Sequence, residues 1–213
     1  MSETSPPDLS LFLDIVFKLE AFDIPYVIIG GFAGILYGLA RATYDIDIIV
    51  DLSAEQIQYL CDAYPLPRYY ADPEQMRKAL KQGQPFNIID TSQGEKADLF
   101  PVTMDEQYRP ALEFRQRQPL EWPGLPPINV WIARREEVIY GKLMALAELH
   151  TERHISDIYE LLLLAYLSDD LEGVEAIAID EPLLDARAAA ISPDIASLWQ
   201  SIKMSARDAA SRS

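Results

Sequence analysis

The chain has 213 residues, of which 49% are hydrophobic and 24% charged, a composition that supports one buried core and excludes an intrinsically disordered protein. It carries 18 lysines and arginines against 34 aspartates and glutamates, and the net charge of −16 argues against extended binding along a nucleic-acid backbone. A single cysteine permits no internal disulfide, and no apolar run approaches the roughly 20 residues of a membrane helix. With no recognisable signal peptide, we expect a soluble, cytoplasmic protein without membrane partners.

Hydrophobic periodicity predicts alternating helices and strands over the first part of the chain. The elements expected up to residue 63 are a helix over 8–22, a strand over 24–29, a Gly-Gly turn at 30–31, a short helix over 32–40, a strand over 45–50 and a helix over 53–63. Ser53, followed by Gln56 three residues later, is typical of a capping box at the start of the last helix.

The rest of the chain adds further strands and then only helices. We expect a proline-rich loop before a helix over 74–81, two strands over 85–90 and 96–102 joined by the turn TSQG, and short strands near 112–117 and 128–132. From residue 135 the periodicity is helical, with breaks at 150–151, 169–170, Pro182 and Pro193. The prediction is an α+β fold: a mixed β-sheet core flanked by helices over 1–134, and a C-terminal helical region over 135–213 that packs on the core.

Two aspartates stand in the second predicted strand, whose other residues are mainly apolar. Successive side chains of a strand point to opposite faces, so Asp45 and Asp47 share one face. Like charges this close repel each other unless a cation lies between them. Oxygen-only ligands suit Mg²⁺ or Mn²⁺, so the pair predicts a metal site, with a solvated edge strand as the alternative.

Gly30 and Gly31 stand at the preceding turn from strand to helix. Without side chains they let backbone N–H groups approach a phosphate closely at the start of a helix. No G-x-x-x-x-G-K-[ST] or G-x-G-x-x-G segment occurs, which excludes a P-loop and a Rossmann fingerprint. The stretch over 27–52 therefore predicts a phosphate cradle beside a metal-ligand pair, although two glycines alone would also suit a tight turn.

The pattern of Gly30-Gly31, thirteen residues and Asp45-Ile46-Asp47 resembles the signature of the DNA polymerase β-like nucleotidyltransferase superfamily. The segment YGLARATYDIDIIV is similar to a subgroup of small prokaryotic nucleotidyltransferases that includes the AbiEii-type toxins. This resemblance covers about residues 25–165 and implies the nucleotidyltransferase fold.

The same resemblance points to residues beyond the glycines and the aspartate pair. In the subgroup an Arg-x-Thr precedes the Asp-x-Asp, and Arg41 and Thr43 match it. A third carboxylate on a neighbouring strand is matched by Asp98 in KADLFPV. A lysine early in the first helix after the core is matched by Lys142, and an R-H-x-x-D-I segment by residues 153–158, which contain Asp157.

The activity implied is that of a metal-dependent nucleotidyltransferase, which transfers an NMP from an NTP to an acceptor and acts as the toxin of a toxin–antitoxin pair. Asp45, Asp47 and Asp98 would be catalytic and hold Mg²⁺ or Mn²⁺, with Asp98 completing a two-metal site or serving as the base toward the acceptor hydroxyl. The nucleotide-binding residues would be Gly30, Gly31, Arg41, Thr43, Lys142 and Asp157. The acceptor stays open between an RNA end, a protein and a small molecule, and any RNA contact would be local.

Several of these residues also have a purely structural interpretation. Lys142 lies beside an apolar stripe and could extend its ammonium group to solvent. Arg41 and Thr43 could simply connect a helix to a strand. Asp157 could pair with a lysine or arginine of the core instead of with a substrate.

The same sequence also allows functions other than nucleotide transfer. His150 and His154 lie four residues apart, but their surroundings match no zinc motif. Net charge is an average, so a local cation such as Lys96 could still hold one nucleotide. The alternative function is a non-catalytic nucleotidyltransferase-fold module for binding or regulation, with the C-terminal helices as the surface for a protein partner.

Overall fold

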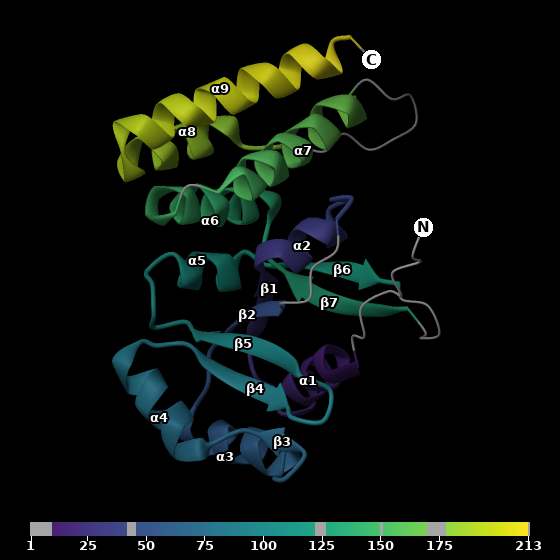
Figure 1. Cartoon of the computed structure of the whole chain (residues 1–213), viewed down its shortest axis with the longest axis vertical. Helices are drawn as coiled ribbons and strands as arrows, with labels where there is room; N and C mark the ends of the chain where they lie inside the picture. The colour runs from purple at the N-terminus through teal and green to yellow at the C-terminus, as the bar shows by residue number, and fades with distance from the viewer. Residues whose placement is uncertain (1–9, 42–45, 122–126, 150, 170–177, 213) are drawn as a thin grey trace. The chain divides into compact units, whose positions relative to one another are not determined.

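The structure is a computed structural model of the chain, and it describes residues 10–41, 46–121, 127–149, 151–169 and 178–212. The chain divides into two compact units (Figure 1). One comprises residues 1–33 and 41–133 and contains the β-sheet, and the other comprises residues 34–40 and 134–213 and is helical. We call them the sheet unit and the helical unit.

The sheet unit is built on a seven-stranded mixed sheet, which has the order β3-β4-β5-β2-β1-β7-β6 among the described residues. The strands are β1 Tyr26–Ile29, β2 Ile46–Val50, β3 Tyr69–Tyr70, β4 Phe86–Asp90, β5 Glu95–Pro101, β6 Gln116–Leu120 and β7 Ile128–Ile132. β2 pairs in parallel with β5, and β1 with β7, while the remaining neighbours are antiparallel. β2 is therefore the central strand.

The central strand is buried along its whole length except at one residue. Ile46, Ile48, Ile49 and Val50 are each at most 5% exposed, whereas Asp47 is half-buried. Strands covered on both faces read as nearly continuous apolar runs, as β2 does. This burial excludes the solvated edge strand that was the alternative explanation for the aspartate at this position.

Three helices of the sheet unit, α1 Ser10–Ala21, α3 Ala54–Ala63 and α4 Pro73–Gln82, follow the sequence pattern closely. The helices α5 Tyr108–Glu113 and α2 Gly30–Leu36 differ from it, and α2 begins here and continues into the helical unit. α1 buries one apolar face that includes Phe12, Ile15 and Leu19. The capping box of α3 is confirmed: Ser53 Oγ accepts from the N–H of Gln56 at 3.2 Å, and Gln56 Oε1 accepts from the N–H of Ser53 at 2.9 Å.

The helical unit contains α6 Arg135–Glu148, α7 Glu152–Asp169, α8 Glu181–Ile191 and α9 Pro193–Ala210. Pro182 and Pro193, predicted as breaks, both stand in the first turn of a helix, where a missing N–H group costs little. The side chains of Asp180 and Ser192 cap these two helices. In the described ranges no helix combines the length and apolar character needed to cross a membrane.

Polar side chains join three of these helices to one another. Asp185 of α8 accepts hydrogen bonds from Trp199 Nε1 at 2.6 Å and from Lys203 Nζ at 2.5 Å, both on α9. Glu181 of α8 accepts from the Tyr166 hydroxyl of α7 at 2.9 Å. Because Trp199 is fully buried, the network also fixes the orientation of a large core side chain.

The strand predicted near 112–117 is present but shifted toward the C-terminus, as β6 Gln116–Leu120. Residues up to Glu113 form α5, in which the N–H of Phe114 bonds the carbonyl of Pro110 at 2.9 Å, and β6 begins only at Gln116. Ala111 and Leu112 are both buried, and two adjacent buried residues fit a helix face better than the alternation of a half-buried strand.

Two further boundaries differ from the prediction. The helix after β1 begins at Gly30 and ends at Leu36, so it is shorter than the predicted 32–40. Tyr69 and Tyr70 form a short strand inside the predicted loop, because β4 offers its open edge to them. Whether the C-terminal helices pack on the core stays a prediction.

A buried aspartate ties the turn between β4 and β5 to the chain before β3. Asp90 is 1% exposed, and its carboxylate accepts from the Ser92 hydroxyl at 2.6 Å, from the Ser92 N–H at 2.9 Å and from Arg68 Nε at 3.0 Å. The Ser92 hydroxyl and the Arg68 guanidinium together lower the pKa of Asp90 to about 2. The folded state therefore favours the ionised carboxylate.

We expect Asp90→Asn to destabilise the chain at neutral pH, because the variant loses the charge that these donors surround. A depressed pKa stabilises the fold above the ordinary aspartate pKa of 3.8 and ceases to do so as the pH falls toward 2. The difference in urea midpoint between wild type and variant should therefore narrow from pH 5 to pH 2.5. A difference that stays constant over this range would contradict the assigned role.

Candidate active site

Three polar residues form one row across the middle of the sheet. Asp47 of β2 stands opposite Asp98 of β5 in the parallel ladder, and Asp98 stands opposite Asn87 of β4 in the antiparallel ladder. Residues directly opposite in a ladder lie on the same face of a sheet. All three are half-buried and alternate with buried apolar neighbours, so a polar row crosses an otherwise apolar core.

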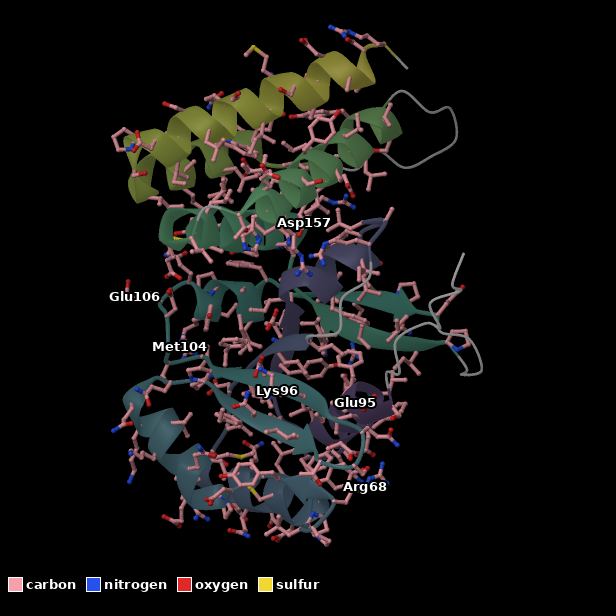
Figure 2. All side chains as sticks on the ribbon, viewed as in Figure 1. Arg68, Glu95, Lys96, Met104, Glu106 and Asp157 are labelled. Carbon is pink, nitrogen blue, oxygen red and sulfur yellow. The ribbon has the colours of Figure 1, made fainter. Side chains whose placement is uncertain are left out.

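Both carboxylate oxygens of Asp98 have a partner. The side-chain amide of Asn87 donates a short hydrogen bond to Oδ1, and the ammonium nitrogen of Lys96 lies 2.8 Å from Oδ2. Lys96, labelled in Figure 2, precedes Asp98 by two residues on β5 and therefore shares its face. A cation thus stands beside Asp98 and offsets part of the repulsion between this carboxylate and Asp47.

Gly30 brings the start of α2 against the carboxylate of Asp47. Its φ of +66° lies in the left-handed region, and a Cβ atom there would stand 3.1 Å from Asp47 Cγ and closer still to Oδ2. Ile29 pairs with Asp47 in the β1–β2 ladder, so the chain leaves the sheet exactly beside the row. A glycine is needed at this position for its backbone conformation and for space. Gly31 follows it, half-buried, in the first turn of α2.

Some predicted site residues cannot be placed. Asp45 and Thr43 lie outside the described residues, so the pairing of two aspartates on β2 stays a prediction. Arg41 is half-buried at a bend that ends the first described stretch. Of the predicted site residues, the structure therefore brings together Gly30, Asp47 and Asp98, and Gly31 follows Gly30 in the chain.

Lys142 and Asp157 form a buried ion pair within the helical unit. Lys142 Nζ of α6 lies 2.5 Å from Asp157 Oδ2 of α7, and the two side chains are 5% and 3% exposed. Asp157 is labelled on α7 in Figure 2. This pairing agrees with the structural interpretation of Asp157 and rules out an ammonium group extended to solvent. Binding of a nucleotide by either residue stays a prediction.

The donor set of the row suits a hard divalent cation. Within the described ranges no three histidines, cysteines, aspartates or glutamates gather closely enough to hold a metal ion. Asp47 and Asp98 are nevertheless adjacent, and they offer only oxygen ligands together with the amide oxygen of Asn87. The Lys96 ammonium lies against Asp98, at a carboxylate oxygen that a metal cation could bind instead. These residues fit Mg²⁺ or Mn²⁺.

Two members of the site were not assigned to it from the sequence. Asn87 is a polar residue between the buried Phe86 and Ile88, a signal that marks it as unusual without saying what it faces. Lys96 drew attention only as a local cation, although its spacing of two from Asp98 places both on one face of a strand. Only the register of β4 against β5 joins Asn87 to the carboxylate.

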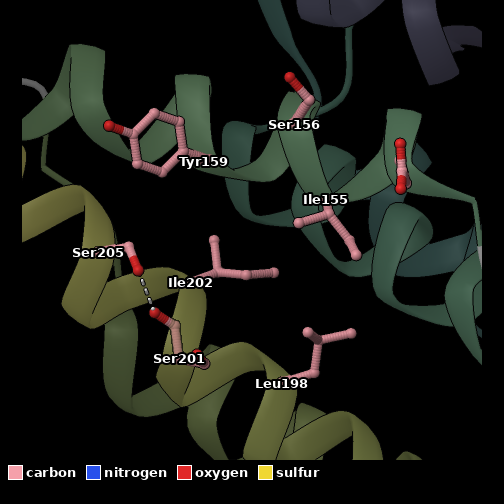
Figure 3. Close-up of a pocket in the computed structure, with 8 residues that line it drawn as sticks. Ile155, Ser156, Tyr159, Leu198, Ser201, Ile202 and Ser205 are labelled. Atoms are coloured by element: carbon pink, nitrogen blue, oxygen red, sulfur yellow. Dashed lines mark hydrogen bonds between the residues drawn. The ribbon is translucent and has the colours of Figure 1, made fainter.

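A cleft elsewhere in the chain contains none of the predicted site residues. It has a volume of about 350 Å³ and lies between α7 and α9, with Ile155, Tyr159 and Ile202 among the residues that line it (Figure 3). Its serines are engaged in part with the backbone, since the Ser205 hydroxyl donates to the carbonyl of Ser201 at 3.0 Å. With Glu152 as its one charged residue, this cleft offers no counterpart to the polar row.

Substitution of Gly30 by alanine should disturb the row itself. The left-handed φ costs alanine about 1 kcal/mol, and the contact with Asp47 adds roughly 1–3 kcal/mol if the carboxylate cannot move aside. Gly94 is a matched control, because its φ is +72° but nothing lies within 4 Å of an added Cβ. Urea unfolding and Mn²⁺ titration should show Gly30→Ala to be less stable than Gly94→Ala and weaker in metal binding. Equal losses in the two variants would contradict the proposed contact.

Comparison with known proteins identifies the family to which the chain belongs. An antigenic nucleotidyltransferase-like protein from Paracoccidioides brasiliensis is 18% identical, with 92% of this chain and 95% of that chain covered and a TM-score of 0.47. JHP933 from Helicobacter pylori is 16% identical, with 98% and 97% covered and a TM-score of 0.41. These likenesses are too weak to support an inference about function, and no curated protein matches the chain. The family described as nucleotidyl transferase AbiEii toxin, type IV toxin–antitoxin system, matches residues 11–210, and the chain belongs to this family of nucleotidyltransferases.

Proposed function

We propose that the chain transfers an NMP from an NTP to an acceptor hydroxyl with the help of Mg²⁺ or Mn²⁺, with pyrophosphate as the leaving group, and that the row of Asp47, Asp98 and Asn87 is the centre of this reaction. The observation that carries the proposal is the register that sets Asp47 opposite Asp98 in the middle of a buried sheet. Carboxylates at such a position are costly unless a ligand or a cation uses them.

Asp47 and Asp98, together with Asp45, are the residues that would hold the metal. When bound, a divalent ion stabilises charge on the attacking and leaving oxygens of an in-line displacement at the α-phosphorus. Asp98 is also the residue that would accept the proton of the acceptor hydroxyl. Asn87 fixes the rotation of the Asp98 carboxylate through its hydrogen bond to Oδ1, and Oδ2, which pairs with Lys96, would become available once that ammonium moves away.

Lys96 has a different task in this proposal. Its ammonium neutralises the charge of Asp98 and thereby reduces the electrostatic repulsion between the two adjacent carboxylates. Its side chain is 44% exposed and long enough to turn away when a metal or a phosphate arrives. We propose that Lys96 moves from Asp98 to a phosphate oxygen of the substrate, where it acts as a point charge.

The remaining predicted residues keep their proposed roles. Gly30 and Gly31 would cradle phosphate oxygens through backbone N–H groups at the start of α2. Arg41 and Thr43 would support the nucleotide. Lys142 and Asp157 would bind the nucleotide as a pair. Their mutual contact means that neither is an isolated buried charge.

The net charge of the chain limits the class of acceptor but does not identify the acceptor. A net charge of −16 is unfavourable for binding along an RNA or DNA backbone, so an RNA acceptor would contact the protein only at its end. A protein hydroxyl and a small-molecule hydroxyl satisfy the same chemistry. We propose an acceptor whose reactive hydroxyl is presented at a terminus or on a small group, and not within an extended polyanion.

The test is transfer of label from each α-labelled NTP onto size-fractionated cell extract, with Mg²⁺ or Mn²⁺. Asp47→Asn should reduce transfer by about 100-fold or more, because metal-held charge is lost at the reacting centre. Asp51→Asn is the matched control: Asp51 follows the same strand four residues on and lies 3.9 Å from Arg109, and its loss should leave transfer within about threefold. The labelled fraction names the acceptor class. Wild-type protein that transfers no label with any NTP or metal would instead favour the binding module.

Removal of the Lys96 charge gives an independent prediction. Lys96→Met leaves the carboxylate row more negative, so Mn²⁺ should bind about threefold to tenfold more tightly by calorimetry, a modest gain because the pair is partly exposed to solvent. Transfer should fall at the same time if Lys96 contacts the substrate. Lys81→Met, an exposed lysine of α4, is the control and should change neither quantity. Weaker Mn²⁺ binding by Lys96→Met would contradict this role.

A further inference from the structure

Arg135, the first residue of α6, is buried without an anionic partner. The residue is 8% exposed, and its Nη1 atom is fully covered and has no hydrogen-bond partner among the described residues. Its guanidinium carbon lies 4.5 Å from the centroid of the Tyr37 ring. A ring face attracts a cation but satisfies none of its N–H groups.

Comparison with the other buried cations makes this arrangement unusual. In the described part of the chain Lys142 and Lys203 are also buried, and each has a carboxylate at 2.5 Å, Asp157 and Asp185 respectively. Burial lowers the pKa of Arg135, because the loss of hydration outweighs the opposing charge interactions with Tyr37 and Glu136. The chain has 34 acidic side chains against 18 basic ones, so the absence of a partner does not follow from a shortage of carboxylates.

The two glutamates that follow Arg135 in the sequence each make a hydrogen bond to another partner. Glu136 accepts from the N–H of Asp180 at 3.0 Å, and Glu137 accepts from Arg187 at 2.8 Å. Arg135 and Lys142 are seven residues apart and therefore share one face of α6. Both cations are buried, and within the described residues only Lys142 of the two lies within ion-pair distance of a carboxylate, that of Asp157 on α7.

We propose that Arg135 is an anion-binding residue, positioned by Tyr37 to receive a phosphate group. A planar guanidinium matches two phosphate oxygens at once, and a dry site strengthens each of these charge-assisted bonds. The assignment of the phosphate to the nucleotide rests on the proposed function. Because Nη1 is covered in the ligand-free chain, we expect the anion to enter with a local rearrangement at the start of α6.

Arg187 provides a matched control within the same unit. Its guanidinium carbon lies 4.9 Å from the centroid of Tyr140, much as Arg135 lies over Tyr37, but its Nη1 pairs with Glu137. The two arginines thus differ in whether Nη1 contacts a carboxylate oxygen. A structural role predicts the same response to substitution in both, and an anion-binding role predicts opposite responses.

The experiment measures thermal unfolding of the full chain with and without inorganic pyrophosphate, in EDTA so that no metal contributes. Wild type should be stabilised by pyrophosphate. Arg135→Met should unfold at the same or a higher temperature than wild type without ligand, because an unpaired buried charge is removed, and should bind pyrophosphate about tenfold or more weakly. Arg187→Met should unfold at a lower temperature, because Glu137 loses its partner, yet keep the full pyrophosphate shift.

The opposite outcomes overturn the inference. They are an absent pyrophosphate shift in wild type, and an Arg135→Met variant that is less stable than wild type while it keeps that shift. Asp47→Asn separates this inference from the proposed function, since it should lose NMP transfer and retain the metal-free pyrophosphate shift. A shift that depends on Arg135 in a chain without transfer activity would support the anion site and remove the enzyme reaction.

Discussion

The parallel pairing of β2 with β5 is the constraint on which the candidate site depends, because it sets Asp47 directly opposite Asp98. A slip of one residue would turn one aspartate toward the other face of the sheet and dissolve the row. The neighbouring features all accommodate these carboxylates. Lys96 supplies a positive charge to Asp98, and the absence of a side chain at Gly30 leaves room for Asp47 at the start of α2.

The buried cations of the helical unit differ in whether they pair with a carboxylate. Lys203 shares Asp185 with the indole of Trp199, so that a buried cation, a buried aromatic ring and two helices are fixed by one carboxylate. The buried pair of Lys142 and Asp157 is self-compensating in the same sense. Arg135 departs from this pattern, because its buried Nη1 has no hydrogen-bond partner within the described residues, and this difference underlies the proposed anion site.

Membership of the AbiEii family identifies the chain as a nucleotidyltransferase. The proposed site names the residues that would carry out this activity. A non-catalytic module has no need to keep Asp47 and Asp98 in register at the centre of a sheet, with Asn87 holding one of them. The acidic surface then restricts the acceptor more than it restricts the nucleotide, because a nucleotide arrives with a metal that offsets its charge, whereas an extended polyanion does not.

The sequence by itself determined the features that depend on neighbours along the chain: the apolar run that makes β2 a central strand, the capping box of α3, and the glycine at the end of β1. Resemblance to a family added Asp98. Tertiary structure alone decided the contacts between distant segments, such as Asn87 with Asp98 and the pairing of β6 with β7, which displaced the strand predicted near 112–117. It also decided which cations are compensated, leaving Arg135 without the carboxylate that Lys142 has. The physical reason is that periodicity reports which face of an element is buried, whereas register and burial of charge depend on pairing between elements.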